Sequence, residues 1–371
     1  MLIYFLLPLL VMYCLFMSRL TVVKNYVQGH NYEFYVNKNH LILFFWSIIL
    51  LGIAVFKGVE VGTDYPMYYG FFLYSFYEEF EPGIRFIYYT AVRYDHFLIF
   101  SFSIYFLIIF FVFKGIKENS PNYLISILLF IITFMYFNSY NQLRQMIAAS
   151  IIFCFANYIV ANNKIKFVFV ILLALLFHDS AIFLFLLFLI PKKRISGKLV
   201  IPLFLLTIIL YFTPEFKNIV GRLIIYFSGS YAEKYTSNLD FFFEVNKEKG
   251  LLQLMPVLIQ MVIVSLSSYF PMKDMNLSVN YKLYDFSINL VVINLCLYSL
   301  AGIEAVDRLQ LYFAFFNIYY YSILIHFLLN CKNVFYGQVF VLIIIGFWCS
   351  YYVMRLIINI GGIVPYSTFF S

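Results

Sequence analysis

Long apolar runs separated by short polar segments are the main pattern of this 371-residue chain. A helix needs about 20 mostly apolar residues to cross the ~30 Å hydrocarbon core of a bilayer. Ten runs reach or approach that length, so the pattern predicts an all-α, polytopic integral membrane protein. The runs cover residues 1–17, 41–56, 97–113, 123–137, 143–160, 199–213, 251–270, 283–300, 309–329 and 334–354.

An eleventh run, Ile165–Ile190, is longer than one span needs and is interrupted in its middle. Its 26 residues would make a single helix of about 39 Å, but His178, Asp179 and Ser180 break the apolar pattern. Lysines precede this run, and lysines and an arginine follow it. Because basic residues favour the cytoplasmic side, we expect a hairpin of two short helices with its apex at His178 on the outer side. The chain then has about 12 membrane segments with both termini outside.

The charge distribution agrees with this threading. The loops assigned to the cytoplasm carry a net charge of +10 and the remaining residues −3, which together give the net +7 of the chain. The positive charge therefore indicates membrane orientation and gives no reason to invoke nucleic acid. A content of 64% hydrophobic and 12% charged residues, with a mean hydropathy of +0.89, excludes an ordinary soluble domain.

Two long loops lie on the outer side in this topology. We expect one transmembrane domain over residues 1–371, with long extracytoplasmic loops at 57–96 and 214–250. The first loop combines many aromatic residues with several glutamates, which suits a helix that lies in the membrane interface and covers part of the outer face. The second is expected to form a mobile flap over that face. The apolar stretch Met1–Met17 lacks a basic start and a cleavage site, so we interpret it as a retained first span.

Polar residues from four separate stretches fall on this outer side. Asp64 opens the first long loop, Arg144 opens the fifth span, His178 lies at the hairpin apex, and Asp307 with Arg308 opens the eleventh segment. A charge at the mouth of an apolar run is costly, so Arg144 should face protein or a water-filled cavity and pair with an anion. The alternative is that Arg144 reaches the lipid headgroups and has no chemical role.

His178 and Asp64 each have a functional and a structural interpretation. An ionisable residue at a helix break inside a membrane favours function, because such breaks are tolerated only beside a cavity or within protein. Asp179 could orient the His178 ring or cap the following helix. Asp64 could act as a base or accept a sugar hydroxyl, or it could be a helix N-cap, since Pro66 follows closely.

Arg308 could join Arg144 in an anion site, because guanidinium groups match phosphate oxygens well. It could instead pair with Glu304, four residues earlier on the same helix. In the preceding segment, Asp285, Asn289 and Asn294 are expected to hold elements together rather than to conduct protons. Five cysteines without metal-ligand spacing imply neither a disulfide framework nor a zinc site, and no nucleotide-binding or metalloprotease motif occurs.

These motifs, taken in order, resemble those of EpsG-like and Wzy-type polysaccharide polymerases. The similar stretches are Gly62-Thr63-Asp64-Tyr65, Arg144-Gln145, Phe177-His178-Asp179-Ser180-Ala181, and Arg308 with Tyr312. The resemblance implies a GT-C-like architecture in the bacterial inner membrane, with the active site facing the periplasm or outer side. It also implies that oligosaccharide repeat units on undecaprenyl diphosphate are joined without a metal or other cofactor. A chain-length regulator and a flippase would be partners, besides the bilayer and the lipid-linked donor and acceptor.

On this hypothesis the candidate residues take separate roles. Arginines stabilise the departing lipid diphosphate, and the acceptor hydroxyl gives its proton to His178 or Asp64. The catalytic candidates are Arg144, His178, Arg308 and Asp64, and the substrate-binding candidates are Tyr65, Gln142, Gln145, Asp179, Asp307 and Tyr312.

Two other functions remain open. An O-antigen ligase would transfer the finished glycan by the same chemistry, whereas a flippase or other transporter would also need a polar cavity between apolar helices. A flippase should present cations to both leaflets, and the one-sided candidates here favour an enzyme. A membrane-bound acyltransferase could use the histidine but gives the two arginines no task. The sugar repeat unit, its linkage and the O-antigen, capsule or exopolysaccharide pathway are open at this point.

Overall fold

We describe the fold from a computed structural model, which defines residues 2–20, 38–227, 251–270, 280–331 and 333–370. Throughout these ranges the regular structure is helical, and the one β-type contact is an isolated bridge between Lys57 and Thr368. The predicted all-α class is therefore confirmed.

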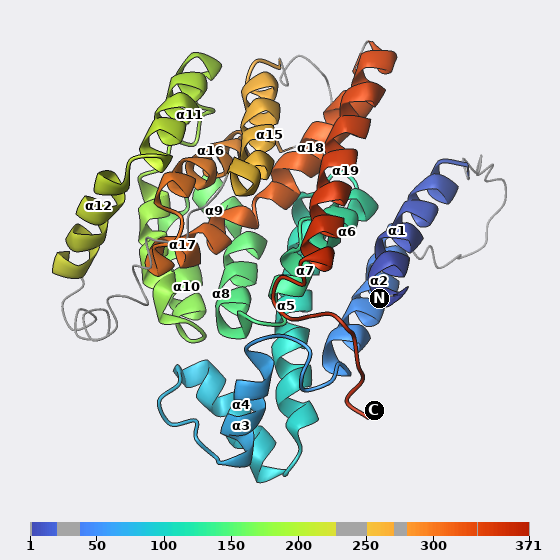
Figure 1. The fold of residues 1–371 in the computed structure, drawn as a ribbon. Coiled ribbons are helices and arrows are strands. Elements are labelled where there is room, and N and C mark those ends of the chain that lie inside the picture. The colour runs from blue at the N-terminus through green and yellow to red at the C-terminus, as the bar shows by residue number, and fades with distance from the viewer. Residues whose placement is uncertain (1, 21–37, 228–250, 271–279, 332, 371) are drawn as a thin grey trace. The chain divides into compact units, whose positions relative to one another are not determined.

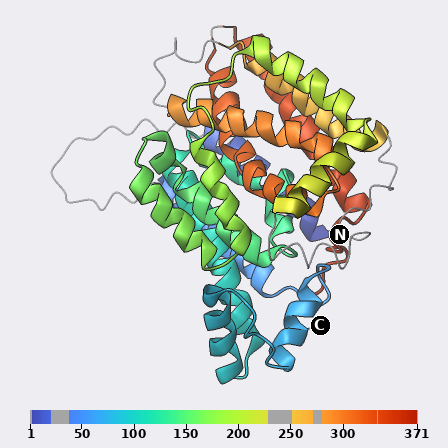
Figure 2. The same ribbon diagram turned by 90° about the vertical axis from the view of Figure 1, so that its left-hand side faces the viewer.

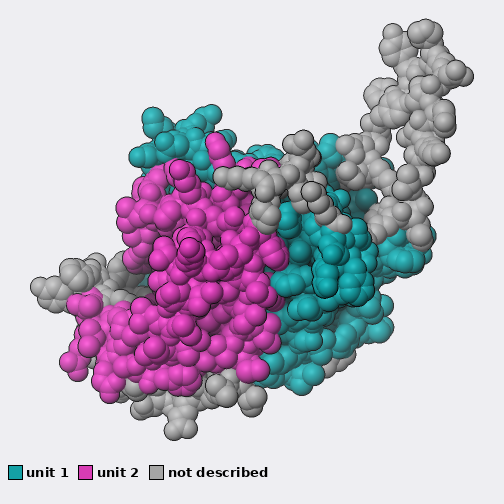
Figure 3. All heavy atoms as spheres, turned by 90° about the horizontal axis from the view of Figure 1, so that it is seen from above, with its two compact units in different colours: residues 1–182, 321–371 teal, residues 183–320 magenta. Residues whose placement is uncertain are grey.

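The chain divides into two compact units, which are coloured separately in Figure 3. The first unit contains residues 1–182 and 321–371, and the second contains residues 183–320. The helices of the first unit are α1 (Leu2–Leu20), α2 (Lys38–Val55), α3 (Tyr65–Leu73), α4 (Pro82–Arg93), α5 (Phe97–Asn119), α6 (Tyr123–Ile132), α7 (Met135–Asn138), α8 (Leu143–Cys154), α9 (Ala156–Val160), α10 (Lys164–Leu175) and α19 (Val334–Ile357). Those of the second are α11 (Gly197–Tyr211), α12 (Pro214–Phe227), α15 (Leu251–Ser267), α16 (Tyr281–Leu297), the 3-10 helix η3 (Tyr298–Leu300) and α17 (Glu304–Ala314), while η1 (Asp179–Phe188) and α18 (Asn317–Leu329) cross the boundary.

Four helical stretches among the described residues are long and apolar enough to cross a membrane. They are α5, α16 with η3, α17 continuing into α18, and α19. A fifth results if α11 and α12, which meet at 95°, form one bent span. Shorter apolar helices of 10–17 residues include α1, α2, α6, α8, η1 and α15. The chain is thus a helical membrane protein, while the count of 12 segments and the GT-C-like architecture stay predictions.

The expected break inside Ile165–Ile190 is confirmed. Helix α10 ends at Leu175, and η1 begins at Asp179, so His178 lies between two helices. The second helix is of the 3-10 type, which the sequence analysis did not predict. A 3-10 helix rises about 2 Å per residue, so the ten residues of η1 extend about 20 Å, still less than a bilayer core.

The first long loop folds into α3 and α4, which lie beside one end of α5 (Figures 1 and 2). Helix α4 turns Ile84, Ile87 and Tyr88 towards the protein, whereas Phe86 and Tyr89 are exposed. The loop is therefore helical, as predicted, whereas its position in the membrane interface stays a prediction. In the second long loop, α12 occupies the start, and residues 228–250 lie outside the described residues.

Among the described helices, four begin with an asparagine whose side chain caps its own helix. Asn122, Asn163, Asn280 and Asn333 precede α6, α10, α16 and α19, and each side-chain oxygen accepts the backbone N–H three residues later. Such caps satisfy one of the unpaired N–H groups that every helix start presents. The same residue type before α8 behaves differently, as described below.

Candidate functional site

Arg144 lies in the first turn of α8, a helix that packs against α5 and α10. The N-terminus of a helix carries partial positive charge, so helix electrostatics disfavours a cation there. The Arg144 side chain is 29% exposed and therefore only partly solvated. Its position calls for an anionic partner.

That partner is Glu81, the residue immediately before α4. Nη1 of Arg144 lies 2.8 Å from Oε2 and 3.0 Å from Oε1 of Glu81, whose side chain is only 4% exposed. A paired arginine inside the protein argues against the alternative in which Arg144 reaches the lipid headgroups. Sequence reasoning missed Glu81, because nothing distinguishes it from Glu78 and Glu79 in the same acidic loop.

His178 contacts the same carboxylate. Its Nδ1 lies 3.1 Å from Oε1 of Glu81, and the backbone N–H of Asp179 donates to the same oxygen at 3.4 Å. A carboxylate beside Nδ1 favours the tautomer with the proton on Nδ1, which leaves Nε2 as a hydrogen-bond acceptor. The carboxylate that orients the ring is therefore that of Glu81, a role that the sequence analysis considered for Asp179.

Aromatic side chains form the wall behind the guanidinium. Nε of Arg144 donates to the hydroxyl of Tyr68 at 3.3 Å, and the ring of Phe80 lies 5.0 Å from the guanidinium carbon. Tyr88 stacks on Phe80 and donates its hydroxyl to the backbone oxygen of Tyr68. This wall restricts water on one side, which strengthens the electrostatic interactions of the cluster.

The tripeptide Glu81-Pro82-Gly83 explains how the loop reaches the histidine. Pro82 starts α4 and keeps the preceding Glu81 in an extended conformation. The N–H of Gly83 donates to the carbonyl of Leu176 at 2.8 Å, at the end of α10. A Cβ at Gly83 would lie 2.7 Å from that oxygen, so the absence of a side chain permits the approach.

The charge of Glu81 is stabilised despite its burial. Burial alone would raise the pKa of Glu81, but the hydrogen bond from His178 and the charge of Arg144 lower it to about 2. Glu81 is therefore an anion at neutral pH, and it compensates the charge of Arg144.

Two polar atoms of the cluster are available for a ligand. Within the described ranges, neither Nη2 of Arg144 nor Nε2 of His178 makes a hydrogen bond to protein. One is a cationic donor and the other an acceptor in the inferred tautomer. Together they can bind an anionic group and receive a proton.

The other candidate site residues of the first unit differ in how exposed their side chains are. Asp64 is partly exposed and occupies the N-cap position of α3, yet its side chain makes no cap and instead accepts from the hydroxyl of Thr63. Tyr65 is buried and donates to Ser101. Gln142 and Asp179 are exposed, whereas Gln145 is buried.

Arg308, Asp307 and Tyr312 belong to the second unit, so their predicted convergence with Arg144 stays a prediction. Asp307 is exposed and accepts the backbone N–H of Gly302, while Tyr312 is buried. The alternative ion pair of Arg308 with Glu304 stays a prediction, because the Glu304 side chain lies outside the described part of the structure.

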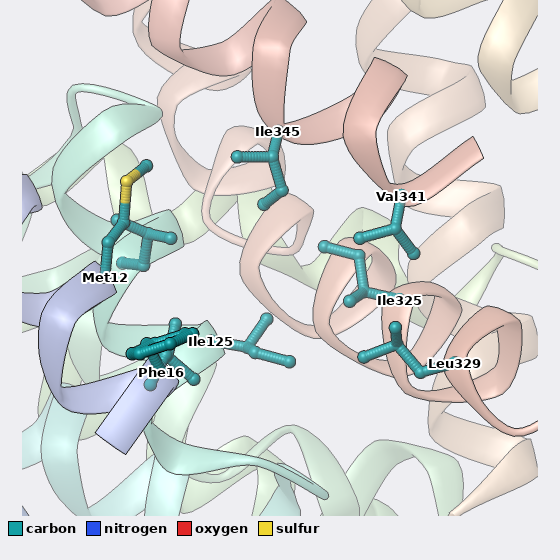
Figure 4. A pocket seen from close by; sticks show the side chains of 9 residues that line it. Met12, Phe16, Ile125, Ile325, Leu329, Val341 and Ile345 are labelled. Atoms are coloured by element: carbon teal, nitrogen blue, oxygen red, sulfur yellow. The ribbon is translucent and has the colours of Figure 1, made fainter. Parts of the chain in front are cut away.

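A separate pocket of about 260 Å³ lies between α1, α6, α18 and α19 of the first unit (Figure 4). All of its lining residues are apolar, Met12, Phe16 and Ile125 among them, so it offers no group for chemistry. The described chain contains no group of three or more histidine, cysteine, aspartate or glutamate residues arranged to hold a metal ion.

In a comparison with known protein families, the chain matches the model of one family. The model of the EpsG family matches residues 40–368, which includes most of α2, all later helices to α19, the Arg144 cluster and nearly all of the C-terminal segment. No curated protein and no solved structure matches the chain.

Proposed function

The chain belongs to the EpsG family, and from this premise we propose that it is a polysaccharide polymerase of the bacterial inner membrane. It transfers a growing glycan from undecaprenyl diphosphate to a lipid-linked oligosaccharide repeat unit on the outer side of the membrane. The observation that carries the proposal is the joint contact of Arg144 and His178 with Glu81. In this proposal Arg144 is the cation and His178 the proton acceptor that the transfer requires, and their shared contact with Glu81 supports it.

Arg144 stabilises the leaving group. The bond between the anomeric carbon of the donor and the diphosphate oxygen breaks, and negative charge grows on that oxygen. A fixed guanidinium is suited to this charge because its orientation is set before the reaction begins. Nη1 and Nε are held by Glu81 and Tyr68, so Nη2 is the atom we assign to a phosphate oxygen.

His178 receives the proton of the acceptor hydroxyl. As the acceptor oxygen forms its bond to the anomeric carbon, Nε2 takes the proton, which then passes to the released diphosphate or to water. Glu81 holds Nδ1 and stabilises the protonated ring that forms, so it acts by positioning. Asp64 is the second candidate for the acceptor proton.

The remaining predicted residues take supporting roles in this proposal. Gln142 and Asp179 are exposed and are assigned to sugar contacts, whereas Tyr65 and Gln145 are buried and stay substrate-binding candidates. Arg308, Asp307 and Tyr312 belong to the second unit, and their part in the reaction stays a prediction. The outward orientation rests on the loop charges, so a cysteine at Glu79 should react with an impermeant reagent in intact cells, and one at Lys193 should not.

The substitution Arg144→Lys tests the proposal. Lysine keeps the charge but loses the planar group that binds Glu81, Tyr68 and phosphate together. We expect chain extension to fall by roughly 10²–10³-fold, the usual cost of losing one stabilising donor. Cells should then display glycans with a single repeat unit, because earlier steps continue.

The glycan length ladder is the measurement, with the amount of protein in the membrane determined in parallel. A normal ladder at a normal protein level would remove Arg144 from the site. A complete loss of attached glycan, without the single-unit product, would favour the ligase function instead.

A further inference from the structure

Asn141 joins three segments that are far apart in the sequence. Its side-chain oxygen accepts the backbone N–H of Thr63 at 2.6 Å, at the start of the first long loop. Its side-chain nitrogen donates to the carbonyl of Gly361 at 3.0 Å, in the segment that follows α19. Asn141 itself lies two residues before α8, so one amide connects the loop, the C-terminal segment and the helix of Arg144.

The C-terminal segment lies beside the start of this loop (Figure 1). Backbone N–H groups of Gly62 and Thr63 donate to the carbonyls of Gly362 and Gly361 at 3.0 and 3.1 Å. Further backbone contacts between the two segments extend to the bridge between Lys57 and Thr368. The start of the loop, from Lys57 to Thr63, is thus held against the C-terminal segment, and Asn141 connects both to the start of α8.

The contacts of Asn141 are not those of a helix cap. The capping asparagines of α6, α10, α16 and α19 bind the N–H three residues later, whereas the Asn141 amide binds two other segments. The backbone is shaped around it: Gly62 and Gly361 have φ of +109° and +82°. A Cβ at Gly361 would lie 2.4 Å from the Asn141 amide nitrogen, and one at Gly62 would lie 2.8 Å from its oxygen.

The hydrogen bond between Thr63 and Asn141 joins the starts of the two helices that carry Tyr68 and Arg144. Thr63 precedes Asp64, the N-cap of α3, and α3 carries Tyr68, which binds Nε of Arg144. Arg144 follows Asn141 by three residues in the first turn of α8. Asn141 therefore determines how the start of α3 is placed relative to the start of α8.

We propose that Asn141 is a positioning residue for Arg144, which it holds at the correct place relative to Tyr68 through the Thr63 and Gly361 contacts. This inference rests on the proposed function, since it concerns the orientation of the group that stabilises the leaving diphosphate. It gives the C-terminal segment a part in catalysis although, among the described residues, that segment makes no hydrogen bond to Arg144 or Glu81.

The test is a double-mutant cycle. Asn141→Ala should lower kcat for repeat-unit addition by about 10- to 100-fold, as expected for a small misplacement of a catalytic group, with little change in KM. In an Arg144→Lys background, the same substitution should cost less than about 2-fold, because the group that it positions is already gone. Rates are measured in membranes supplied with the host's lipid-linked repeat unit and expressed per molecule of protein.

Asn163→Ala is the matched control, because Asn163 also precedes a helix but forms an ordinary N-cap. It should change kcat by less than about 2-fold, since a cap contributes only about 1 kcal/mol to stability. If Asn141→Ala does not accumulate, Asn141→Asp takes its place, because it keeps the shape but cannot donate to Gly361.

The possible outcomes separate this inference from the proposed function. Equal losses from Asn141→Ala in both backgrounds, or a loss that appears only in protein level, would overturn the positioning role. Normal activity of Arg144→Lys alone would instead overturn the proposed function.

Discussion

Arg144 in the first unit and Arg194 in the second are both partly buried arginines, but their surroundings differ. Arg144 contacts side chains from separate segments, with Glu81 at 2.8 Å and Tyr68 at 3.3 Å. Arg194 donates to the backbone carbonyl of Phe270 at 3.0 Å, and its nearest carboxylate, Asp285, is 3.9 Å away. In the first cluster, titratable side chains lie within hydrogen-bond distance of one another, whereas Arg194 hydrogen-bonds a backbone carbonyl and has its carboxylate partner at a longer distance.

Asn289 reinforces this difference within the second unit. Its amide donates to the carbonyls of Pro191 and Lys193 and accepts the N–H of Ile195, so these three hydrogen bonds all go to backbone. The prediction that Asn289 holds elements together is thus confirmed. The contrast with the Arg144 cluster indicates where function lies: polar atoms there contact one another and leave Nη2 and Nε2 open, whereas those near Arg194 serve the chain itself.

Among the variants that test this contrast, His178→Gln is expected to have the largest effect on the rate. Glutamine can still donate to Glu81 but cannot take a proton, so repeat-unit addition should fall by about 10²–10⁴-fold. The rate per molecule of protein in isolated membranes is the measurement. His326→Gln alters a half-buried histidine of α18 and should leave the rate nearly unchanged; equal losses in both variants would mean that His178 is structural.

A smaller effect is expected from Glu81→Gln, which keeps the shape but removes the charge. We expect a rate loss of about 10-fold or more, because Arg144 and the protonated His178 both lose their counter-charge. Glu79→Gln, at an exposed position of the same loop, is the control.

The same variant should change how stability depends on pH. Since the pKa of Glu81 is lowered from 4.5 to about 2, its pairing stabilises the wild type fully above pH 4.5 and is lost as the pH falls towards 2. Thermal unfolding in detergent should therefore show a smaller acid-induced loss in Glu81→Gln. An identical pH dependence in the two proteins would show that Glu81 is not stabilised by its partners.

The helical class and two members of the cluster could be predicted because their signals are local. Apolar runs report helices, and Arg144 and His178 attract attention as ionisable groups at the ends or breaks of such runs. Even the break before η1 follows from the polar triplet and the basic flanks. These inferences require no knowledge of which segments meet.

Glu81 could not be predicted because its role depends on a long-range contact. The loop brings it to α8 and α10 only through the approach of Gly83 to Leu176, and this approach leaves no periodic signal. Tyr65 shows the same limit: its motif favours sugar binding, its burial and its hydrogen bond to Ser101 are visible only in the fold, and its role stays a prediction. Burial and pairing of polar residues are tertiary properties, whereas residue type is a sequence property.

The smallest effect is expected from Arg194→Lys, the same substitution that should stop chain extension at Arg144. The Arg194 side chain is 25% exposed, and its carboxylate is 3.9 Å away, so the ion pair contributes at most about 1 kcal/mol. A lysine ammonium can still donate to the Phe270 carbonyl or approach Asp285. Protein level should therefore drop slightly, and the glycan ladder should stay complete. If Arg194→Lys shortened the ladder as much as Arg144→Lys at equal protein levels, the contrast between a chemical and a structural arginine would be wrong. The ladder would then report a general sensitivity of this membrane protein to the loss of a guanidinium.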